Sequence, residues 1–125
     1  MSKKKVLVID DSATVRQEVS QCLTRVGFEV LEAADGQSGA EAIDKDATIS
    51  VVICDVNMPR MNGIDMLISV KSHPKNASLP ILMLTTDGQP ALIKKAKEAG
   101  AKGWVVKPFN PVQLVAAVQK LAGPG

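Results

Sequence analysis

Aromatic side chains are almost absent from this chain of 125 residues, which has two phenylalanines, one tryptophan and no tyrosine. Proteins that bind single-stranded nucleic acid without sequence preference stack its bases on aromatic rings. The net charge of +2 is also too small to attract nucleic acid or a membrane surface by itself. The composition therefore argues against both nucleic acid and membrane as partners.

Cysteine is scarce, and long apolar segments are missing. Cys22 falls on an apolar helical stripe and Cys54 ends an apolar run, so both are expected to be small core residues rather than metal ligands or a disulfide. The N-terminus lacks the apolar segment of a signal peptide. No apolar run approaches the ~18 residues that a membrane-spanning helix needs. These features favour a cytoplasmic location.

Two kinds of apolar pattern alternate along the chain. Short apolar runs predict strands at residues 6–9, 28–32, 50–54, 81–84 and 104–106. Apolar residues at helical spacing predict helices around residues 15–26, 40–43, 64–71, 90–99 and 114–121. In the first helix, Asp11 or Ser12 is the expected N-cap, Val26 is expected on the buried face and Gly27 is expected to end the helix. This alternation predicts an α/β fold, a doubly wound five-stranded parallel sheet with helices on both faces.

The chain length suits one domain. We expect a single domain over residues 1–125, with no output domain. No long exposed apolar stripe is evident, so a monomer is expected.

Polar residues follow four of the expected strands. They are Asp10 and Asp11 after the first strand, Asp55 after the third, Thr85 after the fourth and Lys107 after the fifth. The carboxyl ends of parallel strands meet at one edge of an open sheet, and ligands bind at that edge. Each residue alone could cap a helix, open a turn or be solvated. Their convergence on one edge instead predicts a binding site.

Three carboxylates at one edge repel each other, by about 4 kcal/mol for a pair at 4 Å and an effective dielectric of ~20. Lys107 supplies one positive charge, so a divalent cation is expected to supply the remainder. Oxygen ligands favour Mg²⁺, with Mn²⁺ as the alternative, over zinc. The cation and Lys107 would neutralise a phosphoryl group to which Thr85 donates a hydrogen bond. The pair Asp10 and Asp11 suits metal binding, so Asp55 is the expected phosphoryl acceptor.

These motifs resemble the receiver domain of two-component response regulators, over essentially the whole chain. The matching segments are Val8–Ser12, Asp55–Pro59, Met61–Gly63, Leu84-Thr85 and Lys107–Phe109. The likeness is greatest to stand-alone receivers of the chemotaxis type. It implies a flavodoxin-like sheet with strand order 2-1-3-4-5, phosphorylation of Asp55 by a histidine kinase, and signalling by protein binding. Such a protein is not an enzyme beyond self-catalysed phosphotransfer and autodephosphorylation.

The resemblance also implies a metal site and residues that tune it. Mg²⁺ would be held by Asp10, Asp11, Asp55 and the backbone carbonyl of Asn57, while Thr85 and Lys107 would contact the phosphoryl group. Asn57 and Asp87 stand at positions that tune dephosphorylation in the family. Thr86 stands where alanine, serine or glycine is more common.

Signal output is implied to run through the fourth helix, fifth strand and fifth helix, which would bind an effector or motor protein. Trp104 stands at the family's aromatic switch position, which is usually tyrosine or phenylalanine. Lys107-Pro108 corresponds to the family's cis peptide bond. The region of the fourth helix is basic, which is also typical of a solvated helix face; its lysines are Lys94, Lys95, Lys97 and Lys102.

The sequence leaves other functions open. A relay or phosphate-sink receiver without direct motor output is the alternative within the family. An aspartate-nucleophile phosphatase usually has a second acid where this chain has Asn57. A flavodoxin-like electron carrier would need a hydroxyl-rich loop after the first strand and aromatic rings to sandwich a flavin. A receiver that is never phosphorylated would lack site residues, and all five are present here.

Overall fold

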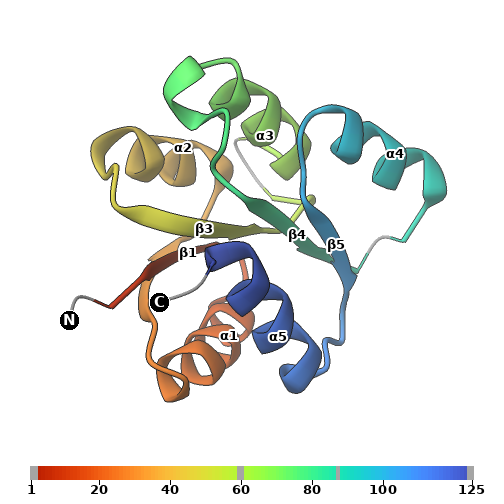
Figure 1. Cartoon of the computed structure of the whole chain (residues 1–125). Helices are drawn as coiled ribbons and strands as arrows, with labels where there is room; N and C mark the ends of the chain where they lie inside the picture. Colours follow the sequence, from red (N-terminus) through yellow and green to blue (C-terminus); the bar gives the residue numbers. More distant parts are fainter. Residues whose placement is uncertain (1–2, 59–60, 87, 124–125) are drawn as a thin grey trace.

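The computed structural model describes residues 3–58, 61–86 and 88–123. Five parallel strands form one sheet in the order β2-β1-β3-β4-β5 (Figure 1). The strands are β1 (Lys5–Ile9), β2 (Glu29–Ala33), β3 (Ile49–Cys54), β4 (Ile81–Thr85) and β5 (Gly103–Val106). The predicted parallel sheet and its implied strand order are confirmed.

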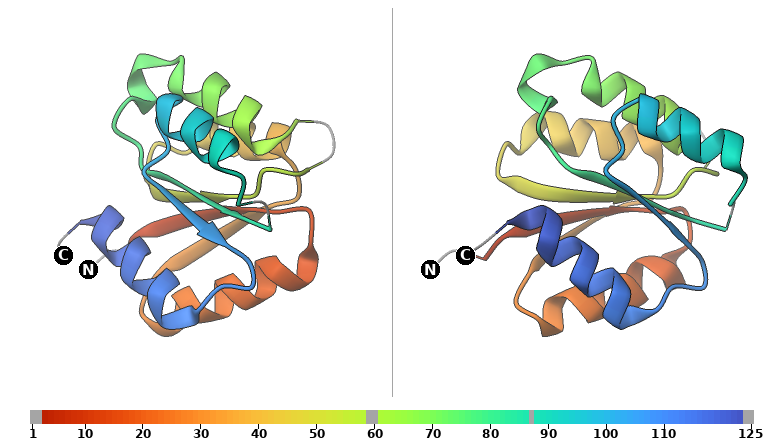
Figure 2. Two further views of the ribbon diagram at one scale, coloured as in Figure 1. Left: turned by 90° about the vertical axis from the view of Figure 1, so that its right-hand side faces the viewer. Right: turned by 45° about the vertical axis from the view of Figure 1, so that its right-hand side comes forward.

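Helices cover both faces of this sheet. They are α1 (Ala13–Arg25), α2 (Gly36–Lys45), α3 (Gly63–Lys71), α4 (Pro90–Glu98) and α5 (Pro111–Ala122), with a short 3-10 turn at Pro74–Asn76. α1 and α5 lie on one face, while α2, α3 and α4 lie on the other (Figures 1 and 2). Within the described part of the chain, every helix is too short or too polar to cross a membrane.

The first helix begins after one of its two predicted caps and ends one residue earlier than its apolar spacing predicts. Ser12, rather than Asp11, is the N-cap, and its hydroxyl accepts a hydrogen bond from the Val15 amide. Gly27 follows the helix with φ of 97°, a conformation that glycine adopts without strain. Val26 corrects the prediction of a buried side chain, because it is the non-helical C-cap and is 44% exposed. The choice of Ser12 as cap leaves the Asp11 carboxylate available to the sheet edge.

Two apolar layers hold the helices to the sheet. One lies under α1 and α5 and includes Val8, Leu23 and Leu114. The other lies under α2, α3 and α4 and includes Leu7 and Leu67. Because alternate residues of β1 enter opposite layers, the central strands are buried on both faces. This rigid centre positions the residues at the carboxyl ends of the strands.

Lys71 ties the end of α3 to the segment that leads into β4. Its ammonium donates hydrogen bonds to the carbonyls of Asn76 (3.1 Å), Ala77 (3.2 Å) and Leu79 (2.5 Å). Burial lowers the pKa of Lys71, and the nearby charge of Lys102 lowers it further. Lys71→Met is expected to lower the free energy of unfolding by about 2 kcal/mol, because these charge-assisted bonds are lost. Urea unfolding measures this, with the exposed Lys102→Met as control; equal losses in both variants would contradict it.

Asp46 lies at the opposite edge of the sheet from the predicted site and accepts hydrogen bonds from Thr48 and Lys5. Hydrogen bonds from Thr48 and from Lys5 lower the pKa of Asp46 to about 2. The unfolded pKa is about 3.9, so this stabilisation is complete above that value and is lost as the pH falls through about 2. As the pH falls from about 3.9 to about 2, the free energy of unfolding of Asp46→Asn should therefore decrease less than that of the wild type. Urea titrations at several pH values measure this. The exposed Glu41→Gln is the control and should follow the wild type.

Candidate functional site

The site residues lie at one edge because the backbone ladder continues one residue beyond three strands. The amide of Asp10 donates to the carbonyl of Ala33 at 3.1 Å, and the amide of Asp55 donates to the carbonyl of Ile9 at 2.9 Å. The amide of Lys107 donates to the carbonyl of Thr85 at 2.8 Å. Each bond anchors a site residue to the neighbouring strand. The positions of the two aspartates and the lysine are therefore set by the sheet itself.

Lys107 bridges the two buried carboxylates. Its ammonium lies 2.7 Å from Asp10 Oδ2 and 3.3 Å from Asp55 Oδ2. The three side chains are only 13%, 2% and 8% exposed, in the order Lys107, Asp10, Asp55. Burial alone lowers the pKa of Lys107, but the hydrogen bond to Asp10 and the charges of both aspartates outweigh it, so the pKa is raised. The lysine is therefore a permanent cation shared by two acids.

Asp11 completes a group of carboxylates that could hold a metal ion. One carboxylate oxygen from each of Asp10, Asp11 and Asp55 lies within 4.8 Å of the others. Three acids face one lysine, so the group carries excess negative charge. All its ligand atoms are hard oxygens, and Asp11 is exposed to solvent. This donor set fits Mg²⁺, which prefers oxygen ligands and retains several waters.

The other residues proposed from the sequence lie around this group. Thr85 is the last residue of β4 rather than the residue after it, and it is fully buried. Thr86 follows it and is exposed, as is Asn57. Trp104 is half-buried on β5, beside Met83 of β4, and packs against the layer under α2, α3 and α4. The implied cis peptide bond between Lys107 and Pro108 is confirmed. Asp87 lies outside the described residues.

Gly63 also lies at the site, although its motif in the sequence predicts no contact there. Its amide donates to the Val56 carbonyl at 2.8 Å. A Cβ at position 63 would lie under 3.0 Å from the backbone carbonyl of Asp55. Close approach of two backbone segments leaves no periodic signal in the sequence. Asn62-Gly63 predicts a turn, whereas the contact with Asp55 becomes visible only in the fold.

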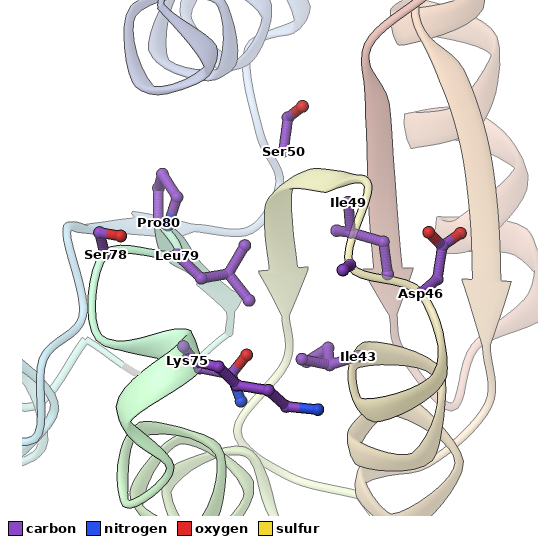
Figure 3. A pocket seen from close by; sticks show the side chains of 10 residues that line it. Ile43, Asp46, Ile49, Ser50, Lys75, Ser78, Leu79 and Pro80 are labelled. Carbon is purple, nitrogen blue, oxygen red and sulfur yellow. The ribbon is translucent and has the colours of Figure 1, made fainter.

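A separate hollow of about 270 Å³ lies at the opposite edge of the sheet (Figure 3). Ile49 and Pro80, near the amino ends of β3 and β4, line it together with Asp46 and Lys75. Both charged residues are already paired, Asp46 with Lys5 at 2.9 Å and Lys75 with Asp44 at 2.8 Å. The cluster of Asp10, Asp11 and Asp55 at the carboxyl ends of the strands is therefore the stronger candidate for a functional site.

Comparison with known proteins agrees with this geometry. A family model, the response regulator receiver domain, matches residues 6–119. The chain is 41% identical over 120 residues to the chemotaxis protein CheY1 of Helicobacter pylori, covering 95% of this chain and 97% of that protein. It is 36% identical over 121 residues to the chemotaxis protein CheY of Thermotoga maritima, covering 95% and 98% of the two chains.

A solved structure gives the same result for the fold. The chemotaxis response regulator CheY4 of Vibrio cholerae superposes with a TM-score of 0.89 at 42% identity, covering 96% of this chain and 99% of that chain. The resemblance first suggested by the sequence motifs is thereby confirmed. The chain belongs to the response regulator receiver family, and it is similar along nearly its whole length to CheY-type chemotaxis regulators.

Proposed function

We propose that Asp55 accepts a phosphoryl group from the phosphohistidine of a histidine kinase. The observation that carries this proposal is the bridge from Lys107 to Asp10 and Asp55, at 2.7 and 3.3 Å. A buried ammonium beside a buried carboxylate offers charge neutralisation at the point where phosphoryl oxygens would arrive. Asp10, Asp11, Asp55 and the backbone carbonyl of Asn57 are the proposed ligands of Mg²⁺, with Mn²⁺ as a substitute.

The proposed reaction is a displacement at phosphorus. A carboxylate oxygen of Asp55 forms the new P–O bond, the P–N bond of the phosphohistidine breaks, and its electron pair returns to the imidazole. Asp55 is oriented for this step by the amide of Val56, which donates to Asp55 Oδ1 at 2.7 Å. Lys107 neutralises the phosphoryl oxygens and Thr85 donates a hydrogen bond to one of them. When bound, Mg²⁺ adds positive charge that reduces repulsion between the phosphoryl group and the carboxylates.

The proposed output is phosphorylation-dependent protein binding through the surface formed by α4, β5 and α5. Val106 of β5 is 46% exposed, and Lys94 and Lys97 of α4 are exposed beside Pro90 and Ile93. Exposed apolar side chains flanked by the charged residues Lys94, Lys97 and Glu98 suit a protein partner. The relatives are named as chemotaxis proteins, which supports chemotaxis or motility as the setting. A cytoplasmic location is part of the same proposal. A phosphate-sink receiver without motor output is the second candidate.

Titration with beryllofluoride in Mg²⁺ tests the proposed acceptor. Beryllofluoride mimics a phosphoryl group on aspartate, so we expect a saturable change in Trp104 fluorescence. Asp55→Asn should lose this response because its amide lacks the anionic oxygen that binds beryllium. Asp65→Asn is the matched control, since Asp65 lies exposed in the first turn of α3. An unchanged response in Asp55→Asn would refute the assignment.

A further inference from the structure

We propose that Arg16 positions the Asp10-Asp11 turn for metal binding. The proposal rests on the proposed function, in which these two aspartates hold Mg²⁺. Arg16 belongs to none of the motifs that mark the site in the sequence. Its role follows from two contacts that its guanidinium makes at the carboxyl edge of the sheet.

The backbone of α1 directs Arg16 toward this edge. Arg16 lies in the first turn of α1, where its amide bonds the carbonyl of the N-cap Ser12 at 3.0 Å. Side chains on a helix lean toward its N-terminus, so the guanidinium passes back over the cap. There Nη1 donates to the backbone carbonyl of Asp10 at 2.5 Å, and Nε donates to Glu32 Oε1 at 3.2 Å. The side chain is only 17% exposed.

A cation at this place needs an explanation, since its side chain is 17% exposed and that of Glu32 is 46% exposed. The N-terminus of a helix carries partial positive charge, so an arginine in the first turn is unfavourable by itself. The carbonyl of Asp10 and the carboxylate of Glu32 offset that effect. The planar guanidinium donates to both from fixed directions, which the ammonium of a lysine cannot reproduce. Arg16 thus joins α1 to the ends of β1 and β2.

The contact with the Asp10 carbonyl bears on Asp11. That carbonyl belongs to the peptide unit that links the two aspartates, so holding it sets the direction in which Asp11 leaves the strand. The Asp10 side chain is already held, since Oδ1 accepts from the Ser12 amide at 2.8 Å and Oδ2 accepts from Lys107. Asp11, by contrast, is exposed. The carboxylates of Asp10 and Asp55 repel the carboxylate of Asp11. Arg16 counteracts this repulsion, because it holds the peptide unit between Asp10 and Asp11 and so keeps the Asp11 carboxylate near the other two.

Positioning and simple charge effects predict opposite results when Arg16 is removed. A nearby positive charge repels Mg²⁺, so losing it would tighten Mg²⁺ binding if charge were all that mattered. Loss of positioning weakens binding instead. Residues that orient metal ligands typically change affinity 10- to 100-fold when mutated. For Arg16→Gln we expect the Kd for Mg²⁺ to rise about 10-fold.

Calorimetric titration of the unphosphorylated protein with Mg²⁺ at constant ionic strength measures this directly. Arg16→Lys keeps the charge and should still bind Mg²⁺ more weakly than the wild type. Glu32→Gln leaves Nε with an uncharged acceptor in place of a carboxylate and should shift the Kd in the same direction by a smaller factor. Arg25→Gln, at the exposed last turn of α1, is the matched control and should leave the Kd unchanged. Thermal unfolding of each variant identifies any general loss of structure.

The outcomes separate this proposal from the proposed function. If the wild type binds no Mg²⁺, or Asp11→Asn binds it as well as the wild type, the proposed metal site itself fails. If the wild type binds Mg²⁺ and Asp11→Asn does not, the Mg²⁺ affinities of the Arg16 variants test the positioning role. A Kd for Arg16→Gln within twofold of the wild type, or a tighter one, would overturn the positioning role. If Arg16→Gln unfolds, an unchanged Kd in Glu32→Gln and Arg16→Lys would overturn it equally.

Discussion

Lys107→Met is expected to lower the free energy of unfolding by about 3 kcal/mol in the absence of divalent cations. The ammonium bridges Asp10 and Asp55, at 2.7 and 3.3 Å, and both carboxylates are buried. Removing one partner of a buried ion pair costs about 3–5 kcal/mol, because the remaining charge is uncompensated. Mg²⁺ should return part of the loss, so the variant should gain more stability from the cation than the wild type does. Urea unfolding with and without Mg²⁺ measures both effects.

The control is an ion pair of similar length on the surface. Lys75 lies 2.8 Å from Asp44, with side chains 53% and 70% exposed. Water and salt screen such a pair, so Lys75→Met should change stability far less than Lys107→Met does and should not respond to Mg²⁺. Equal losses in the two variants, or no effect of Mg²⁺ on Lys107→Met, would contradict the electrostatic description of the site.

Gly63→Ala is expected to disturb the phosphoryl acceptor directly. The added Cβ would lie under 3.0 Å from the Asp55 carbonyl, which is backbone and cannot rotate away. Overpacking typically costs about 1–3 kcal/mol, and here the strain falls on the residue that must receive the phosphoryl group. We therefore expect both reduced stability and at least a tenfold slower reaction with acetyl phosphate, since a misplacement of ~1 Å can cost about 10²-fold in rate.

Gly88→Ala is the matched glycine substitution. A Cβ at Gly88 would lie 3.5 Å from Val106 Cγ2, an ordinary contact. Its stability should remain close to that of the wild type. The contrast in unfolding free energy and in phosphorylation rate separates close packing at Asp55 from the general effect of replacing a glycine. Similar behaviour of the two variants would show that the acceptor does not depend on this packing.

Most of the fold and the centre of the site follow from patterns that a sequence displays. Apolar runs that end in Asp10, Asp55 and Lys107 identify both the strands and the residues they deliver to one edge. Parallel pairing of the strands then brings those residues together, independently of the conformation of the loops. The short bridge between Lys107 and the two acids is the physical outcome of that rule.

The contacts that could not be predicted join residues with no periodic relation. Arg16 reaches backward over its own helix cap to a backbone carbonyl, and Gly63 approaches another backbone segment. Val26 fits the helical period yet is exposed, because the helix ends one residue earlier. Backbone approach and helix ends depend on three-dimensional packing, so composition and spacing do not reveal them.

Phosphoryl transfer to Asp55 is the central step of the proposed function, and the site of covalent labelling tests it most directly. The protein is incubated with acetyl phosphate and Mg²⁺, the acyl phosphate is trapped by borohydride reduction, and the modified residue is located by peptide mass spectrometry. We expect one modified residue, Asp55, no modification without Mg²⁺, and none in Asp55→Asn. Modification of a different residue, or undiminished labelling of Asp55→Asn, would contradict this step.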